Sequence, residues 1–158
     1  MLPQEVAQLI GKTGETVIRE VEKGAIKKFA DAVNDHNLLY WDDEYARKSR
    51  YGSIIAPPGF FGWPVKWTKG LPTFSKLMDE LMVTMVKVGY VRGLDGGIEY
   101  DFFYPVRAGD ILVAVPKLID IYERERKDAK MIFSVIETSY SNQNGDLVAK
   151  TRQTLIHR

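Results

Sequence analysis

GIEYDFFYPVRAGDILVAVPKLIDIYERERKDAKMIFSVIETSY, residues 97–140, carries the pattern that decides the fold. The strands expected within it are residues 98–104, 111–122 and 131–140. Pro105 ends the first strand, and the charged residues 123–128 are expected to form the turn before the third. Because proline donates no amide proton, Pro116 in the second strand requires an edge position or a bulge.

The rest of the chain adds one hairpin and several helices to this sheet. Asn144-Gly145 is the strongest short hairpin signal, and residues 147–156 return after it as a further strand. Residues 16–21 alternate like a strand near the start of the chain. Apolar spacing and helix-starting residues predict helices at residues 4–10, at 23–33, after Pro58, and from Thr73 to about Met85. These elements predict an α+β fold in which a curved antiparallel sheet wraps around a helix, as one domain spanning residues 1–158.

Composition excludes several classes of function. The chain has 22 Lys and Arg against 21 Asp and Glu, so it lacks the basic excess of proteins that bind nucleic acid or membrane surfaces. It has no cysteine and two histidines, which excludes disulfides, thiolate sites and a histidine-rich metal site. No signal-peptide pattern or membrane-length apolar run is visible, and we expect a cytoplasmic protein.

Two blocks of sequence resemble a known family. Residues 29–46 and 50–58 (FADAVNDHNLLYWDDEYA and RYGSIIAPP), followed by residues 97–110, resemble the N-terminal MaoC-like dehydratase domain. The resemblance implies a hot-dog fold, usually paired with a second hot-dog chain. It implies thioesters of CoA or of an acyl carrier as ligands, with no further cofactor and no metal.

The resemblance also implies where a catalytic site would lie. Catalytic relatives use an Asp and, five residues later, a His to hydrate an α,β-unsaturated thioester. Asp35 matches the Asp, but Tyr40 occupies the His position, and tyrosine with a pKa near ~10 donates a proton more readily than it accepts one. A His-Gly pair of the family aligns with Ala56-Pro57, and proline has no N–H for an oxyanion. These departures are typical of the substrate-holding half of such enzymes.

Each candidate residue has a functional and a structural interpretation. Asp35 and His36 form either an adjacent acid and base or part of a local turn, and Asp42 is expected to cap the helix after it. Tyr40 either contacts the ligand or packs the loop. The candidate ligand-binding residues are Ala56, Pro57, Pro58, Gly59, Trp63, Met78, Met82, Arg47 and Arg50. The methionines suit an acyl-chain wall or a core, and the arginines suit CoA phosphates or a solvated turn.

The leading hypothesis is therefore a subunit of an enoyl-thioester hydratase or 3-hydroxyacyl-thioester dehydratase. It holds the acyl group and pairs with a catalytic hot-dog chain, since strands 111–122 and 131–140 are apolar on both faces. Three further hypotheses remain open: a self-sufficient homodimer that uses Asp35 with His36 or Tyr40, a hot-dog thioesterase, and a non-enzymatic acyl-CoA binding module.

Overall fold

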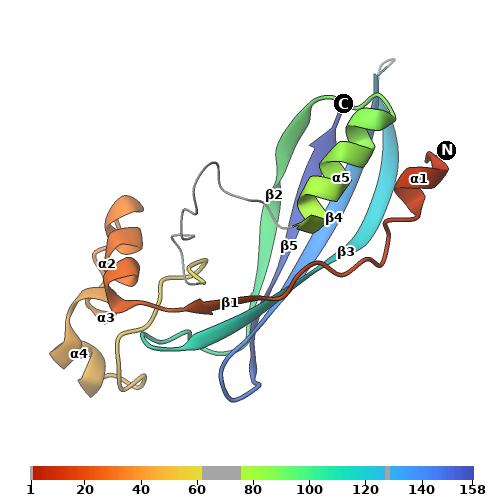
Figure 1. Ribbon diagram of the computed structural model, residues 1–158. Helices are drawn as coiled ribbons and strands as arrows, with labels where there is room; N and C mark the ends of the chain where they lie inside the picture. The colour runs from red at the N-terminus through yellow and green to blue at the C-terminus, as the bar shows by residue number, and fades with distance from the viewer. Residues whose placement is uncertain (1, 62–75, 127–128) are drawn as a thin grey trace, which may run out of the picture.

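The computed structural model describes residues 2–61, 76–126 and 129–158 of the chain (Figure 1). Its sheet is antiparallel, in the order β1-β3-β4-β5-β2. The strands are β1 (Val17–Glu20), β2 (Gly93–Phe102), β3 (Ile111–Arg126), β4 (Ala129–Ser141) and β5 (Leu147–His157). The predicted α+β class and the antiparallel run of strands are thus confirmed.

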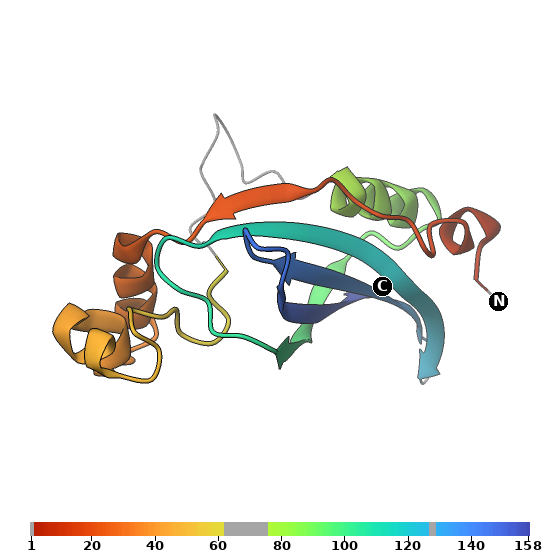
Figure 2. The same ribbon diagram turned by 90° about the horizontal axis from the view of Figure 1, so that it is seen from below.

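The helices lie at two places along the sheet. Within the described residues they are α1 (Gln4–Ala7), α2 (Lys23–Ala32), α3 (Leu38–Trp41), α4 (Asp43–Lys48) and α5 (Lys76–Lys87). Figures 1 and 2 show α2, α3 and α4 grouped at one end of the molecule, with α1 and α5 at the other end. Each group encloses its own hydrophobic core against the sheet.

Helix α5 packs on the sheet through one face. Leu77, Leu81 and Met85 recur every four residues on that face and are buried. They form one core with residues of β3 and β4, among them Leu118 and Ile132. The predicted amphipathic helix is therefore confirmed, whereas its expected start at Thr73 lies outside the described residues.

A second core lies under the other helical group and holds the chain around residues 54–61. Ile26 and Ala30 on the inner face of α2 are fully buried, as Val148 of β5 is. Phe60 is 1% exposed and packs in the same cluster. Because this core encloses both α2 and the end of the sheet, it fixes the segment that follows Ile54 relative to both.

Three expectations about local structure were wrong. Pro58 lies in a turn and not at the start of a helix, because the amide of Phe60 donates to the carbonyl of Pro57 at 3.0 Å. The charged residues 123–126 belong to β3, so the hairpin turn is shorter than expected. Strand β2 begins at Gly93 and ends at Phe102, earlier at both ends than the pattern indicated.

Pro116 lies in an interior strand, at a level where β1 has already ended. Strand β1 pairs with β3 only up to Val17, opposite Ala114. Beyond it the amide of Gly14 donates to the carbonyl of Pro116 at 2.8 Å, so Pro116 turns its backbone polar side toward a coil and no ladder bond is lost. An added Cβ at Gly14 would lie 2.9 Å from Cγ of Pro116, which explains the glycine there.

Candidate functional site

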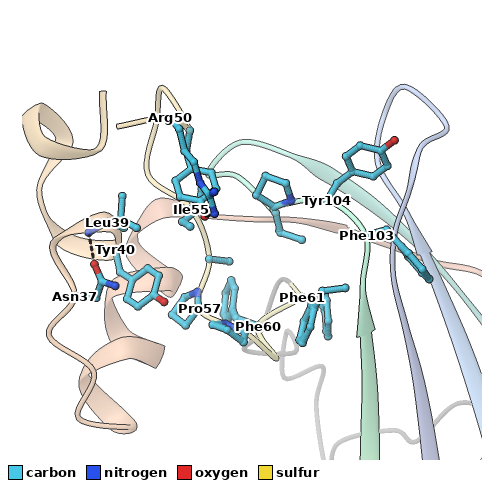
Figure 3. A pocket seen from close by; sticks show the side chains of 16 residues that line it. Asn37, Leu39, Tyr40, Arg50, Ile55, Pro57, Phe60, Phe61, Phe103 and Tyr104 are labelled. Carbon is cyan, nitrogen blue, oxygen red and sulfur yellow. Dashed lines mark hydrogen bonds between the residues drawn. The ribbon is translucent and has the colours of Figure 1, made fainter. Parts of the chain in front are cut away.

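A pocket of about 480 Å³ opens between the segment after α2 and the loop that follows β2 (Figure 3). Its wall is predominantly apolar and rich in aromatic side chains. The residues that line it are Asn37, Leu39, Tyr40, Arg50, Tyr51, Ile55, Ala56, Pro57, Pro58, Phe60, Phe61, Phe102, Phe103, Tyr104, Pro105 and Val106. These residues come from two stretches about fifty positions apart in the chain.

Short backbone pairing brings the two stretches together. The amide of Ala56 donates to the carbonyl of Val106 at 2.7 Å, and the amide of Ala108 donates to the carbonyl of Ile54 at 3.0 Å. Ile55 forms an isolated bridge with Arg107 between these two bonds. The amide of Ala56 is thus already bonded, and it is not available to a ligand in this arrangement.

A tight turn then places Phe60 against α2 and Phe61 against the sheet. Gly59 has a φ of 89°, the value that the third position of a type II turn requires, and Pro58 suits the second position. Phe61, which follows the turn, stacks on Tyr140 of β4 with the ring centroids 4.3 Å apart. It also stacks on Phe102 of β2 at 6.3 Å. The turn and these aromatic contacts make a rigid wall.

Tyr40 of α3 is the buried tyrosine of the pocket, 7% exposed. Its ring points from the helix toward Pro57 (Figure 3). Burial, and then the nearby Asp35 and Tyr51, raise the pKa of the Tyr40 hydroxyl above its ordinary value. The hydroxyl therefore stays protonated at neutral pH and offers a ligand a hydrogen-bond donor.

Asp35 and His36 make local contacts beside the pocket. The carboxylate of Asp35 accepts from the amide of Asn37 at 3.1 Å. The backbone carbonyl of Asp35 accepts from the indole N–H of Trp41 at 3.0 Å. The ring of His36 is exposed, with Nε2 3.0 Å from the side-chain oxygen of Asn34. Neither residue is among those that line the pocket. Their participation in catalysis stays a prediction.

Asp42 caps α4 as the sequence indicated. Its carboxylate accepts from the amides of Glu44 at 2.8 Å and Tyr45 at 2.9 Å. We expect Asp42→Ala to lower the free energy of unfolding by about 1 kcal/mol, because two amides of the first turn lose their acceptor. Asp42→Asn keeps an acceptor oxygen and should recover most of that loss. Urea denaturation of both variants tests this, and equal losses would contradict the capping role.

The predicted ligand-binding residues fall in three places. Ala56, Pro57, Pro58 and Arg50 line the pocket, as Tyr40 does, and Gly59 lies in the turn beside them. Met78 and Met82 lie on α5 near the other core, and Arg47 is exposed on α4. Trp63 lies outside the described residues.

Several lining residues were not expected from the sequence. They are Asn37, Leu39, Tyr51, Ile55, Phe60, Phe61, Phe102, Phe103, Tyr104, Pro105 and Val106. The sequence held one sign of this wall: three consecutive aromatic residues precede Pro105, whereas a half-buried strand alternates apolar and polar residues. Within the described residues, no group of three His, Cys, Asp or Glu side chains is arranged to hold a metal ion. In the same part of the chain, no helix is long and apolar enough to span a membrane.

Known proteins resemble the chain in sequence and in fold. Residues 8–151 match the family model described as FAS1-like, dehydratase domain region. A UPF0336 protein of Saccharopolyspora erythraea is 28% identical over 141 residues, which cover 88% of this chain and 81% of the relative.

Two solved structures share the fold. The ChsH1-ChsH2 complex from Mycobacterium tuberculosis contains a chain with a TM-score of 0.82 and 18% identity, over 97% of this chain and 93% of that one. A MaoC-like dehydratase from Rhodospirillum rubrum gives a TM-score of 0.62 and 20% identity, over 94% and 91%. These likenesses confirm the expected hot-dog fold.

Proposed function

The chain belongs to the family of FAS1-like dehydratase domain regions, which confirms its resemblance to MaoC-like dehydratases, and from this premise we propose that it is the acyl-binding half of a thioester hydratase. The reaction adds water across the double bond of a trans-2-enoyl thioester, or removes water in the reverse direction. The ligand is an acyl thioester of CoA or of a carrier protein, bound in the cytoplasm without a further cofactor.

The observation that carries this proposal is the pocket with Tyr40 in it. Its cavity of about 480 Å³ is walled by aromatic and aliphatic side chains, which suit the apolar part of an acyl group. The one buried titratable side chain among the described lining residues is Tyr40, at the position where the family resemblance places a histidine. A protonated tyrosine holds a carbonyl oxygen by donating to it, but it does not activate water as a base.

We assign catalysis to a partner for two further reasons: the described pocket lacks a backbone donor for an oxyanion, and Asp35 does not line it. Pro57 has no N–H, and the amide of Ala56 is bonded to Val106 at 2.7 Å, so the backbone there offers no donor to a developing oxyanion. The carboxylate of Asp35 accepts from the amide of Asn37 outside the pocket lining, so we do not assign it the role of the base. A second hot-dog chain with a complete Asp and His pair would supply both the base and the oxyanion donor.

Strand β2 supports pairing with another chain. It is an edge strand of the sheet, bonded to β5 on one side. Ile98 is 44% exposed and Phe102 51%, and Phe103 after the strand is also 51% exposed. An exposed edge strand of ten residues that carries large apolar side chains among polar ones invites pairing with another chain. The solved ChsH1-ChsH2 complex, similar in fold, is an assembly of two different chains.

The experiment is hydration of a short and a long trans-2-enoyl-CoA, first by the purified chain and then with the hot-dog protein encoded nearest to it. We expect binding without turnover by the chain alone, no effect of Asp35→Ala on binding, and turnover once the partner is added. Turnover by the chain alone that disappears in Asp35→Ala would overturn the proposal and indicate a self-sufficient homodimer.

The same assay distinguishes hydration from hydrolysis and from binding alone. Release of free CoA, followed with a thiol reagent, would indicate a thioesterase instead, because hydration leaves the thioester bond intact. Binding without any turnover in the presence of the partner would indicate a non-enzymatic acyl-CoA binding module.

A further inference from the structure

Two guanidinium groups converge on Tyr51 at the rim of the pocket. The guanidinium of Arg50 lies over the ring of Tyr51, 4.8 Å from its centroid, and donates to the Tyr51 hydroxyl at 2.6 Å. From the other stretch of chain, Nε of Arg107 donates to the Tyr51 carbonyl at 3.4 Å. Arg50 and Tyr51 line the pocket, and Arg107 directly follows the lining residue Val106.

Neither charge is neutralised by an acidic side chain in the part of the chain that the structure describes. Cations on the nearby helices do have such partners, since Lys23 pairs with Asp43 and Lys48 with Glu44, both at 2.6 Å. The acid nearest to Arg107 in sequence, Asp110, bonds to backbone and amide groups and not to the guanidinium. Its carboxylate accepts from the backbone amide of Arg107 at 2.7 Å and from the side chain of Gln143 at 3.1 Å.

This arrangement suits a phosphate. A guanidinium presents its donors in a planar fork that matches phosphate oxygens, and both groups here are held in place by Tyr51, so little side-chain freedom is lost on binding. The aromatic cavity behind them suits the acyl group. The carrier arm of the same ligand must leave across the rim, where its phosphate would meet the two arginines.

We propose that Arg50 and Arg107, held by Tyr51, bind a phosphate of the carrier arm of the acyl thioester. The inference rests on the proposed function and names its recognition residues. It replaces Arg47, the other expected phosphate contact, which is exposed on α4 and not among the residues that line the pocket. CoA and the prosthetic arm of a carrier protein both carry a phosphate next to pantetheine, and CoA carries further phosphates.

The test compares three thioesters of trans-2-butenoate, with CoA, with 4′-phosphopantetheine and with phosphate-free pantetheine. Their binding to the full chain and to the Arg50→Gln/Arg107→Gln variant is measured by calorimetry. We expect each lost guanidinium to weaken binding of a phosphate-bearing ester by about tenfold, with pantetheine ester binding unchanged. Arg124→Gln is the control for loss of charge, because Arg124 is exposed on β3 over the ring of Tyr122, and it should bind all three esters like the wild type.

The pattern of loss identifies the phosphate. Weaker binding of both phosphate-bearing esters assigns the site to the phosphate next to pantetheine, and weaker binding of the CoA ester alone assigns it to the phosphates that only CoA has. Unchanged binding of all three esters would overturn the phosphate site and leave the proposed function standing. If the wild-type chain binds none of them, the proposed function fails together with the site.

A second variant protects the test against misfolding. Arg50→Lys keeps the charge but loses the planar fork, so it should bind the CoA ester with an affinity between those of wild type and Arg50→Gln. Binding of the CoA ester by the wild type should also weaken with salt, and this dependence should become shallower in the double variant. Equal salt dependence in both proteins would contradict the site.

Discussion

Leu81→Ala is expected to lower the free energy of unfolding by about 2–5 kcal/mol, the range for a fully buried leucine. Leu81 is 0% exposed at the centre of the face that α5 turns to the sheet, in one core with Leu118, Ile132 and Ile136. Removing its side chain leaves a cavity between a helix and two strands that the sheet prevents from closing. Urea denaturation followed by far-UV circular dichroism measures the loss.

Met82 provides the matched control on the same helix. It is 37% exposed, so Met82→Ala should cost no more than about 1 kcal/mol. Because Leu81 and the pocket lie in different cores, the folded fraction of Leu81→Ala should bind an acyl thioester like the wild type. Equal losses for Leu81→Ala and Met82→Ala would show that α5 does not pack on the sheet through this face.

The strands that the sequence predicted well are those with one buried face. In β4, Ile132, Ser134 and Ile136 are buried and the residues between them, which the sequence shows to be apolar as well, are half-buried, so burial alternates along the strand. Strand β2 lacks such alternation. Its glycines break the apolar pattern around a register shift between Asp95 and Gly97, and its residues are almost all exposed. Its start was therefore missed.

The charged end of β3 shows tertiary pairing overriding local preference. Residues 123–126 resemble a solvated turn in sequence, yet the ladder with β4 continues through them. Arg124 lies over the rings of Tyr122 at 5.2 Å and Phe133 at 5.6 Å, so a charged side chain covers aromatic surface on the strand. A pattern of charge alone does not reveal that contact.

The pocket could be predicted only on one side. Tyr40 and Ala56-Pro57 were identified because the family resemblance covers their stretch of chain. The opposite wall is residues 102–106. The sequence predicted only a strand end and a turn there, because local patterns do not show which distant segment a residue faces. The pairing of Ala56 with Val106 creates that neighbourhood, and it depends on the tertiary fold.

The buried histidine near the end of β5 should make stability depend on pH. His157 is 1% exposed, and Nε2 lies 3.1 Å from the hydroxyl of Ser134, which is also buried. Nδ1 has no hydrogen-bond partner among the described residues, so a proton added to the ring would leave a buried charge with an unsatisfied donor. Burial accordingly lowers the pKa of His157 below its ordinary value of 6.5.

A lowered pKa means that the unfolded chain binds a proton at higher pH than the folded chain does. The contribution of His157 to stability is therefore complete above about pH 6.5, decreases as the pH falls from there, and is lost once the pH reaches the lowered pKa of the folded state. In that window the free energy of unfolding should fall by up to about 1.4 kcal/mol per pH unit from this group. Urea denaturation at pH values from about 4.5 to about 8 measures how steeply the free energy of unfolding depends on pH.

His157→Gln keeps a polar group near Ser134 but does not titrate, so its stability should decline less steeply below about pH 6.5 than that of the wild type. His36→Gln is the control, because the other histidine of the chain is exposed, with its ring 3.0 Å from the side-chain oxygen of Asn34. This variant should keep the wild-type slope. If His157→Gln keeps it as well, the acid sensitivity comes from carboxyl groups, and the folded state tolerates a protonated ring at this position.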